Sequence, residues 1–409
     1  MPLTHPYQYM PRQLLLTHDF PPMGGGIARW MGELAKRMPA GSLVVSTGEY
    51  AGSELADRLL PNPVDRLPVP SRRLRSLQGT WRWARRVEAI ARGVSAEFIW
   101  CGNLKPAAYP ARWVKMRAGV PYGVFLHGGD LLILRRQIRR SLVKRRAARA
   151  LLGSASVLVA NSAWTTALCR AVLQELALSR PEDRVCTVPL GSDPEVFRPG
   201  LDQTDVRRRY RLDQRRWLLS VARLTRHKGI DTALRALAQL APRYPDLAYA
   251  VVGYGDDLAA MEQLSLSLGL AERVRFLTQV PDADLPQLYN CAEIYLGLSR
   301  YMDERVEGFG ISLVEASASG LPVIAGNSGG VADAVRDEVT GILVDPERPD
   351  LVCAAVRRLL DNRELGLQLG AAGREAVQNY YNWNRVAEDV DRMGREYGRL
   401  RPPSLPDAR

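Results

Sequence analysis

The chain has 409 residues, of which 46% are hydrophobic and 24% are charged. At roughly 150 residues per domain this length predicts two or three domains, and the composition excludes a fibrous or disordered protein. Uncharged apolar runs, such as residues 217–222, are far shorter than the ~20 residues of a membrane span. Because the N-terminus shows no basic segment leading into an apolar one, we expect no secretory signal and a cytoplasmic protein.

The positive charge is unevenly distributed along the chain. The net charge is +12, and residues 1–200 carry 29 Lys and Arg against 14 Asp and Glu, whereas residues 201–409 carry the remaining 27 against 30. An excess confined to the first half predicts that this half faces something anionic, whether nucleic acid, a phosphorylated substrate or an acidic lipid surface.

Short apolar segments alternate with longer amphipathic ones along the whole chain, which is typical of parallel sheets covered by helices. The sequence therefore predicts an α/β protein with one doubly wound sheet in each half. The stretch 197–205, with Pro and Gly, is the expected linker, and ligands are expected where the carboxyl ends of the strands meet. The expected strands are 13–17, 43–46, 98–101, 123–126, 157–160, 185–188, 218–221, 248–252, 274–277, 294–296, 322–325 and 342–344.

Three glycines, Gly24, Gly25 and Gly26, join the first strand to a helix expected from Ile27. Glycines there let backbone N–H groups approach an anion at the helix N-terminus, although a plain tight turn explains them equally well. A nicotinamide-binding loop is disfavoured because the G-x-G-x-x-G spacing is missing. The second strand is also expected to stop short of Glu49, which leaves no acidic residue at its end.

One of the four histidines, His127, follows an expected strand and precedes two glycines. Its place at the carboxyl edge of a sheet, beside flexible backbone, leaves room for a ligand and makes it a candidate catalytic residue. A purely structural histidine is the alternative.

Two cations, Arg223 and Lys228, lie in a loop between the strand at 218–221 and a helix expected near Ile230. Arg can bind two oxygens and Lys supplies a compact charge, so the pair predicts a diphosphate site, with solvated surface charge as the alternative. The next strand ends in a second glycine turn at the same edge, with Gly253 and Gly255.

Two glutamates, Glu307 and Glu315, flank the start of a helix expected from Ile311. Glu315 should point towards the helix N-terminus, where a carboxylate can accept hydrogen bonds from vicinal hydroxyls such as those of a ribose. Glu307 can accept from the hydroxyls of another sugar. Between the two lie residues whose backbone N–H groups should reach the head of the helix, namely Gly308, Phe309 and Gly310.

In their order and spacing these motifs resemble a retaining glycosyltransferase of family 4 with the GT-B fold, in which two Rossmann-like doubly wound domains face each other across a cleft. The resemblance covers nearly the whole chain and includes FLHGGD, VLVANSAWT, VPLGSDPEVFRP and VARLTRHKGID. It implies that residues 1–198 bind the acceptor and that residues 199–380 bind the nucleotide sugar. Residues 381–409 would form a closing helix that returns to the first domain, followed by a tail.

The resemblance also implies roles for the residues of the second half. Arg223 and Lys228 would hold the donor diphosphate, and Glu315 the nucleoside ribose. Glu307 would hold the donor sugar, together with the backbone N–H groups of Phe309 and Gly310.

In the first half, the resemblance places His127 against the donor sugar at the reaction centre. The loop of Gly24, Gly25 and Gly26 would meet the phosphates or the acceptor. The implied catalytic set is therefore His127, Arg223, Lys228 and Glu307.

No metal and no cofactor besides the nucleotide-sugar co-substrate are expected. Asp282 and Asp284 have the Asp-x-Asp spacing of a metal site found in a different glycosyltransferase fold, but they precede an expected helix and are better explained as helix caps. The resemblance implies that cationic side chains and helix dipoles neutralise the departing diphosphate instead. The odd number of cysteines shows no Cys-x-x-Cys pair and predicts buried thiols, namely Cys101, Cys169, Cys186, Cys291 and Cys353.

Two basic helices are expected at 72–92 and 134–149, each with an apolar stripe. Burial of the stripe against the sheet is the plain explanation. The alternative is that both helices rest on an anionic membrane, at ~1 kcal/mol per basic residue, and lead the domain to a lipid-linked acceptor. Nucleic acid is disfavoured because no recognition motif accompanies the charge. The stripes are Leu74, Leu77, Trp81, Ala84 and Val87 in the first helix, and Leu134, Ile138 and Leu142 in the second.

The expected activity is transfer of a hexosyl unit, with retention, from GDP-mannose or a UDP-hexose to a hydroxyl of a glycan or lipid-linked acceptor. Such an enzyme would serve polysaccharide or glycolipid synthesis, peripherally on the inner face of the membrane. A GT-B-fold epimerase and a non-catalytic nucleotide-sugar-binding protein remain as alternatives. The segment around Glu307 is most similar to mannosyl- and glucosyl-transferring relatives, which favours GDP-mannose.

Overall fold

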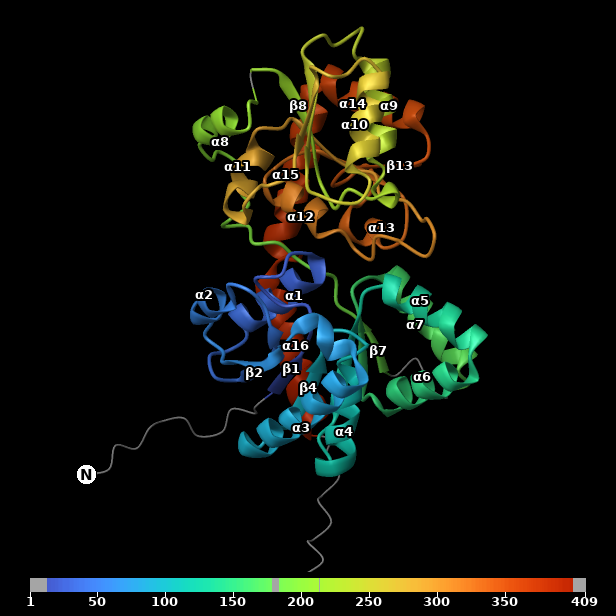
Figure 1. Ribbon diagram of the computed structural model, residues 1–409. Coiled ribbons are helices and arrows are strands. Elements are labelled where there is room, and N and C mark those ends of the chain that lie inside the picture. Colours follow the sequence, from blue (N-terminus) through green and yellow to red (C-terminus); the bar gives the residue numbers. More distant parts are fainter. Residues whose placement is uncertain (1–12, 179–183, 213, 400–409) are drawn as a thin grey trace, which may run out of the picture. The chain divides into compact units, whose positions relative to one another are not determined.

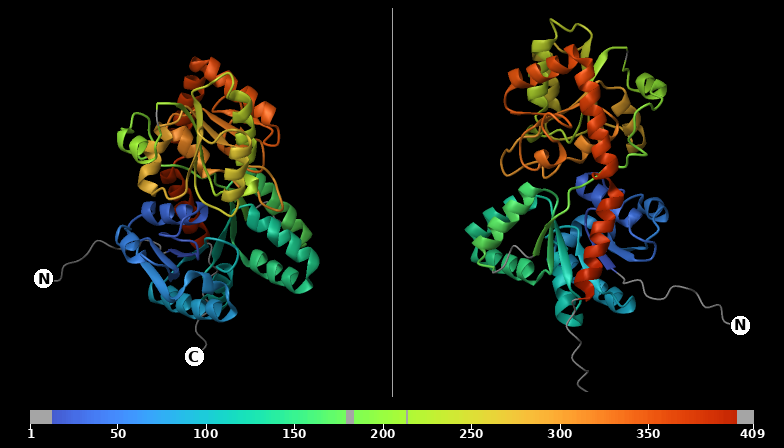
Figure 2. Two further views of the ribbon diagram at one scale, coloured as in Figure 1. Left: turned by 45° about the horizontal axis from the view of Figure 1, so that its top comes forward. Right: turned by 180° about the vertical axis from the view of Figure 1, so that it is seen from behind.

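The computed structural model describes residues 13–178, 184–212 and 214–399. The chain divides into two compact units, which we call unit 1 (Met1–Val188 with Trp383–Arg409) and unit 2 (Pro189–Asn382). Figure 1 labels the elements of both units, and Figure 2 gives two further views. Each unit is an α/β structure built on one sheet.

In the described part of unit 1 the sheet has seven parallel strands in the order β3-β2-β1-β4-β5-β6-β7. Its central strands are buried on both faces, as the continuous apolar runs in the sequence predict. The strands are β1 (Gln13–Leu16), β2 (Leu43–Glu49), β3 (Val64–Pro70), β4 (Phe98–Cys101), β5 (Tyr122–Leu126), β6 (Val157–Ala160) and β7 (Val185–Thr187). The helices are α1 (Gly26–Arg37), α2 (Ser53–Arg58), η1 (Ser71–Arg75), α3 (Leu77–Gly93), α4 (Ala108–Ala118), α5 (Gly129–Arg140), α6 (Leu142–Ser154), α7 (Ala163–Glu175) and α16 (Trp383–Arg399).

In the described part of unit 2 the sheet has six parallel strands in the order β10-β9-β8-β11-β12-β13. The strands are β8 (Arg216–Val221), β9 (Leu247–Val252), β10 (Val274–Leu277), β11 (Ile294–Gly297), β12 (Val323–Gly326) and β13 (Ile342–Val344). The helices are α8 (Thr204–Arg209), η3 (Arg226–Lys228), α9 (Ile230–Leu240), α10 (Leu258–Ser267), η4 (Asp282–Asp284), α11 (Leu285–Asn290), α12 (Ile311–Ala318), α13 (Val331–Ala334), α14 (Pro349–Asp361) and α15 (Arg363–Asn379). The sheet order reverses between β8 and β11, which is where doubly wound sheets bind ligands.

Strand β3 is missing from the sequence prediction. Within the described residues it is an edge strand that pairs with β2, with a register shift at Gly48/Glu49. Two prolines and two charged residues occupy its seven positions, a composition that is tolerated at a sheet edge and does not look like a buried strand.

The crossing between the units lies at Val188/Pro189, earlier than the boundary expected at 198/199 and the linker expected at 197–205. Phe197 is buried with its ring 5.6 Å from that of Tyr289, and Leu201 N–H donates to Asn290 Oδ1 at 3.3 Å. The expected linker is therefore packed on unit 2. The second crossing lies at Asn382/Trp383, close to the boundary expected at 380/381.

Helix α16 packs on the sheet of unit 1, beside α1 and β4 (Figure 1). Buried Gln13 at the start of β1 connects these elements, because its Nε2 donates to Asp391 Oδ1 at 2.7 Å while its Oε1 accepts from Trp100 Nε1 at 2.7 Å. Gly394 makes room for this contact, since a Cβ at that position would lie 2.0 Å from Gln13 Oε1.

The two basic helices differ from the expectation. The segment 134–149 is broken at Ser141, whose Oγ caps α6 by accepting from Lys144 N–H. The apolar stripes are only partly buried: Leu74, Ala84, Val87, Leu134 and Ile138 are in the core, whereas Leu77, Trp81 and Leu142 are 91%, 54% and 74% exposed. None of the helices in the described residues is long and apolar enough to cross a bilayer.

Replacing Gly394 with Ala should lower the free energy of unfolding of unit 1 by about 1–3 kcal/mol, because the added methyl group displaces a buried amide that holds two partners. Denaturant unfolding of the full chain measures this. Gly93→Ala, where a Cβ would meet nothing within 4 Å, is the matched control and should leave the midpoint unchanged or slightly higher. Equal midpoints for the two variants would contradict the packing of α16.

Candidate functional site

A cationic loop follows β8 in unit 2 and carries Arg223, Arg226, His227 and Lys228 before α9 begins. The loop is held by close backbone contacts with its neighbours. Leu224 N–H donates to Tyr254 O at 2.9 Å, and Arg226 N–H donates to Asp257 Oδ2 at 2.8 Å.

Two expected site glycines, Gly253 and Gly255, support this loop from β9. A Cβ at Gly253 would lie 1.9 Å from Ala222 O, and one at Gly255 would lie 2.2 Å from Leu224 O. Only glycine allows the two loops to approach so closely, and Gly253 also has φ +139°. Their visible role is thus to shape the cationic loop.

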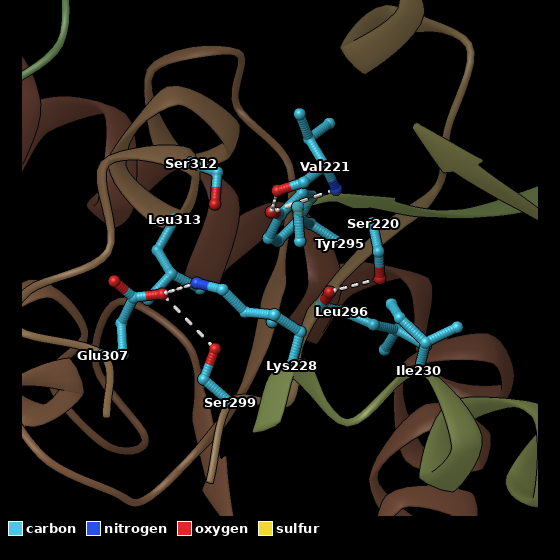
Figure 3. A pocket seen from close by; sticks show the side chains of 12 residues that line it. Ser220, Val221, Lys228, Ile230, Tyr295, Leu296, Ser299, Glu307, Ser312 and Leu313 are labelled. Atoms are coloured by element: carbon cyan, nitrogen blue, oxygen red, sulfur yellow. Dashed lines mark hydrogen bonds and ion pairs between the residues drawn. The ribbon is translucent and has the colours of Figure 1, made fainter. Parts of the chain in front are cut away.

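A small pocket at the carboxyl edge of this sheet brings Lys228 and Glu307 together (Figure 3). Lys228 Nζ forms an ion pair with Glu307 Oε2, and Ser299 Oγ donates to the same oxygen at 3.3 Å. The pocket is lined by Ser220, Val221, Ala222, Lys228, Ile230, Tyr295, Leu296, Gly297, Ser299, Glu307, Ser312 and Leu313. Ser299 and Ser312 are not among the site residues predicted from the sequence.

The ion pair keeps Glu307 ionised. Burial would by itself raise the pKa of this half-buried carboxyl, but the adjacent Lys228 charge, their hydrogen bond, His227 and the Ser299 hydroxyl together bring the pKa below its usual range. The pocket therefore presents an ammonium group and a carboxylate side by side at neutral pH. Such a pair can bind a ligand that is anionic at one end and rich in hydroxyls at the other.

His227 precedes Lys228 and influences Glu307, and the sequence prediction did not single it out. Its Nδ1 lies 3.0 Å from Thr225 Oγ1. Burial is the largest cause that lowers the pKa of His227. Together with the charges of Lys228, Arg305 and Arg223, and against the opposing effect of Glu307, it brings the pKa to about 4. The ring is therefore neutral at pH 7. Arg223 is exposed, so its side chain is accessible to an anion. Its charge also contributes to the low pKa of His227.

Helix α12 presents its N-terminus near the same pocket. Gly310 precedes it with φ +105°, a conformation that favours glycine, and Ser312 in its first turn lines the pocket. Gly308, Phe309 and Gly310 are buried. Glu315 is also buried, and its Oε2 accepts from Tyr289 OH at 2.9 Å. The same hydroxyl oxygen lies 3.3 Å from Ser312 O, so the Glu315 carboxylate lies over the preceding turn, towards the helix N-terminus.

In unit 1, His127 lies at the end of β5, as expected. Its Nε2 is 2.7 Å from the Gly102 carbonyl oxygen, and its ring meets Trp30 edge-on at 5.2 Å. A carbonyl only accepts hydrogen bonds, so Nε2 carries the proton and Nδ1 is left as the acceptor in the neutral ring. Asp130 holds the His127 backbone, because its Oδ1 accepts from His127 N–H at 3.1 Å.

The loop of Gly24, Gly25 and Gly26 is exposed at the N-terminus of α1, and Gly25 has φ +119°. This backbone form requires glycine whether or not a ligand binds. The neighbouring strand β2 reaches Glu49, which corrects the expectation that the strand ends earlier. The lack of an acidic residue at the end of this strand therefore no longer argues against a nicotinamide site. Only the missing G-x-G-x-x-G spacing still argues against one.

A polar cluster at the same edge of unit 1 has no motif in the sequence. His18 and Asn103 are buried, with Asn103 Nδ2 2.7 Å from His18 Nδ1. Arg75 Nε donates to His18 Nε2 at 3.0 Å, and Asp19 Oδ2 lies 3.1 Å from the same nitrogen. These residues come from η1 and from the loops after β1 and β4, so only the folded chain brings them together.

Asp284 does not form with its side chain the helix cap that is expected of Asp282 or Asp284. Asp284 occupies the N-cap position of α11, but its side chain makes no capping hydrogen bond. Its Oδ2 instead accepts from Tyr210 OH at 2.6 Å and from Arg209. Among the described residues no group of three or more His, Cys, Asp or Glu side chains is arranged to hold a metal ion.

Two family models match the chain. The model described as "Glycosyl transferases group 1" matches residues 202–376, and the model described as "Glycosyl transferase 4-like domain" matches residues 25–191. The first match contains the pocket at Lys228 and Glu307, and the second contains His127.

Relatives similar over nearly the whole chain are named as glycosyltransferases. The GDP-mannose-dependent alpha-(1-6)-phosphatidylinositol monomannoside mannosyltransferase of Mycobacterium tuberculosis is 31% identical over 396 residues, which cover 92% of this chain and 96% of that protein. The protein of the same name in Mycolicibacterium smegmatis is 30% identical over 92% of this chain and 97% of its own.

Solved structures share the fold. The crystal structure of HepE from Anabaena in complex with UDP and glucose has a TM-score of 0.76 at 20% identity, covering 94% of this chain and 99% of that one. Sucrose-phosphate synthase from Thermosynechococcus elongatus has a TM-score of 0.76 at 22% identity, covering 95% and 99%.

The protein is an enzyme of the nucleotide-sugar glycosyltransferase class, as its two domains and its relatives define it. It belongs to the group 1, or family 4, glycosyltransferases. The expected resemblance is confirmed, and so is the expected fold class, α/β with the GT-B architecture of two Rossmann-like domains.

His227 should make stability depend on pH. Because its pKa is about 4 in the folded chain and near 6.5 when unfolded, the unfolded state binds more protons between these values. The contribution to stability is thus complete above pH 6.5 and is lost as the pH falls towards 4. Solvent screening at a half-buried ring reduces the effect to about 1 kcal/mol.

Urea unfolding of the wild type and His227→Gln at pH 7.0 and 4.5 measures this. The wild type should lose about 1 kcal/mol more than the variant between the two pH values. Parallel losses in both proteins would show that His227 does not titrate as described.

Proposed function

We propose that the pocket at Lys228 and Glu307 binds the diphosphate and the sugar of a nucleoside-diphosphate hexose, and that the enzyme transfers the hexosyl unit with retention of configuration. The ion pair between the two side chains carries this proposal. It unites a cation suited to phosphate with a carboxylate suited to sugar hydroxyls, at the place where α/β sheets bind ligands.

Lys228 and Arg223 act on the leaving group. Cleavage of the bond between the anomeric carbon and the phosphate oxygen builds negative charge on the diphosphate, so cations nearby are worth more in the transition state than in the ground state. Lys228 has three N–H donors and can bind a phosphate oxygen while it still contacts Glu307. Exposed Arg223 can add a two-oxygen contact.

Glu307 and the head of α12 hold the sugar. The ionised carboxylate accepts from sugar hydroxyls, and the backbone N–H groups of Phe309 and Gly310 offer donors at a helix N-terminus. Glu315 accepts from the ribose hydroxyls, with Tyr289 fixing its carboxylate. His127, with Nδ1 as acceptor, contacts a sugar hydroxyl at the reaction centre, and the loop of Gly24, Gly25 and Gly26 contacts the phosphates or the acceptor.

GDP-mannose is the proposed donor. Two relatives at 30–31% identity are named as GDP-mannose-dependent, whereas the structure with UDP and glucose is 20% identical. The proposed acceptor is a hydroxyl of a membrane glycolipid, since the names of these relatives specify phosphatidylinositol monomannoside. We propose that the reaction needs no metal, because Lys228, Arg223 and the N-terminus of α12 supply the positive potential.

Lys228→Ala should lower the transfer rate about a hundredfold, equivalent to ~3 kcal/mol of transition-state stabilisation. Release of nucleoside diphosphate and formation of a glycosylated product are measured together, because an epimerase or a silent binding protein would not yield both. Arg235→Ala removes an exposed cation from α9 outside the pocket and is the control. Near-normal turnover of Lys228→Ala would refute the assignment.

We further propose that the junction of α5 and α6 contacts an anionic membrane surface from the cytoplasmic side. Leu142 and Val143 are 74% and 75% exposed there. Exposed cations flank them on both helices, namely Arg139, Arg140, Lys144, Arg145 and Arg146. Apolar side chains inside a ring of cations suit a bilayer with acidic headgroups, where each cation contributes ~1 kcal/mol.

The double variant Leu142→Ser/Val143→Ser should bind vesicles that contain an acidic phospholipid several-fold more weakly than the wild type does, in a co-sedimentation assay. Leu367→Ser, at a 62% exposed position on α15 of unit 2, is the matched control and should bind like the wild type. Equal sedimentation of the wild type with acidic and neutral vesicles would end the membrane proposal without affecting the donor site.

A further inference from the structure

A buried cation lies directly behind the candidate donor site. Arg300 follows β11 and is only 7% exposed, and it is not among the residues that line the pocket. Its Nη2 donates to Asp231 Oδ2 at 3.0 Å, and its Nη1 donates to Thr232 Oγ1 at 3.1 Å. Its backbone N–H donates to His227 O at 2.8 Å.

These contacts hold the Lys228 segment from both sides. His227 precedes Lys228, while Asp231 and Thr232 follow it in the first turn of α9. Between them Gly229, with φ +69°, lies so close to the end of β11 that a Cβ would be 2.0 Å from Leu298 O. The short segment 298–300 is thus the template that fixes the position of the Lys228 backbone.

The same segment also sets the Glu307 side of the pair. Ser299, between the two template residues, donates to Glu307 Oε2 at 3.3 Å. A shift of Arg300 would therefore disturb the contacts of Lys228 and Glu307 together. Misplacement of about 1 Å by a residue remote from the chemistry can cost a hundredfold in rate.

Charge gives Arg300 a second effect. Asp231 lies at the start of α9, next to Ile230, which lines the pocket. A carboxylate without a counter-charge there would repel a diphosphate and weaken the favourable potential of the helix N-terminus. Arg300 neutralises Asp231 from the buried side and leaves Lys228 as the charge that an anion meets.

Stability alone does not account for this ion pair. Two buried atoms of the pair, Arg300 Nε and Asp231 Oδ1, have no hydrogen-bond partner. An incompletely bonded buried ion pair contributes little net stability compared with apolar side chains of similar volume. A role in fixing the loop is the better explanation.

We propose that Arg300 is a positioning residue of the diphosphate site, which holds the Lys228 loop on β11 and cancels the charge of Asp231. This inference rests on the proposed function, because it requires that the pocket bind a diphosphate.

The test compares binding of GDP, UDP and the nucleosides guanosine and uridine to the full-length protein by calorimetry or competition. Arg300→Met should weaken the binding of whichever diphosphate the wild type prefers at least tenfold, with little change in the affinity for its nucleoside. Arg300→Met/Asp231→Asn removes both charges and should recover most of the lost affinity, and Arg300→Lys should lie between Met and the wild type.

Arg273→Met is the control, because Arg273 donates to Pro245 O at 2.6 Å beside the start of β9, at the opposite edge of the same sheet. It should leave the preference for diphosphate over nucleoside unchanged. If Arg300→Met binds the diphosphate like the wild type, or loses diphosphate and nucleoside affinity equally, the inference is wrong. If Arg300→Met does not fold, the Arg300→Lys and double variants decide, again by the affinity for the diphosphate relative to that for its nucleoside. A wild type that binds neither diphosphate would instead refute the proposed function.

Discussion

The ion pair between Lys228 and Glu307 is the interaction on which the rest of the site depends. The two side chains lie far apart in the sequence and come from loops after different strands of one sheet. The Lys228 charge and its hydrogen bond outweigh the effect of burial and lower the pKa of Glu307, so this carboxylate stays ionised at neutral pH. An ammonium group and a carboxylate held together in this way can bind the two halves of a sugar diphosphate at once.

Backbone packing supplies the rigidity that this pair needs. Glycines at 229, 253 and 255 let three loops approach to distances that any Cβ would prevent. Arg300 then ties the cationic loop to β11, and Tyr289 holds the Glu315 carboxylate on α12. Groups fixed before the ligand arrives need little reorganisation as charge develops in the transition state, which is the usual source of electrostatic catalysis.

Sequence reasoning located the elements whose signal lies within one segment, such as the buried strand β5 with its continuous apolar run. It also singled out Lys228 and Glu307, which stand beside glycines and which the structure brings together, and their roles stay predictions. It failed where contacts between distant segments determine whether a strand forms, a side chain is buried or a residue acts at the site. Edge strand β3 has prolines and charges, and Leu142 is exposed although Leu134 and Ile138 of the same apolar stripe are buried. The role of Arg300 depends on Asp231, 69 residues away, so no local pattern could have indicated it.

The most direct measurement of the central claim is the thermal or denaturant stability of the full chain with nucleoside diphosphates and with the corresponding nucleosides. At a hundred times its dissociation constant, GDP or UDP should stabilise the protein by about 2.7 kcal/mol, and Lys228→Ala should reduce that gain. Guanosine and uridine at the same concentrations should stabilise it much less. Stabilisation by nucleosides equal to that by diphosphates, or by neither, would contradict a diphosphate site built on this ion pair.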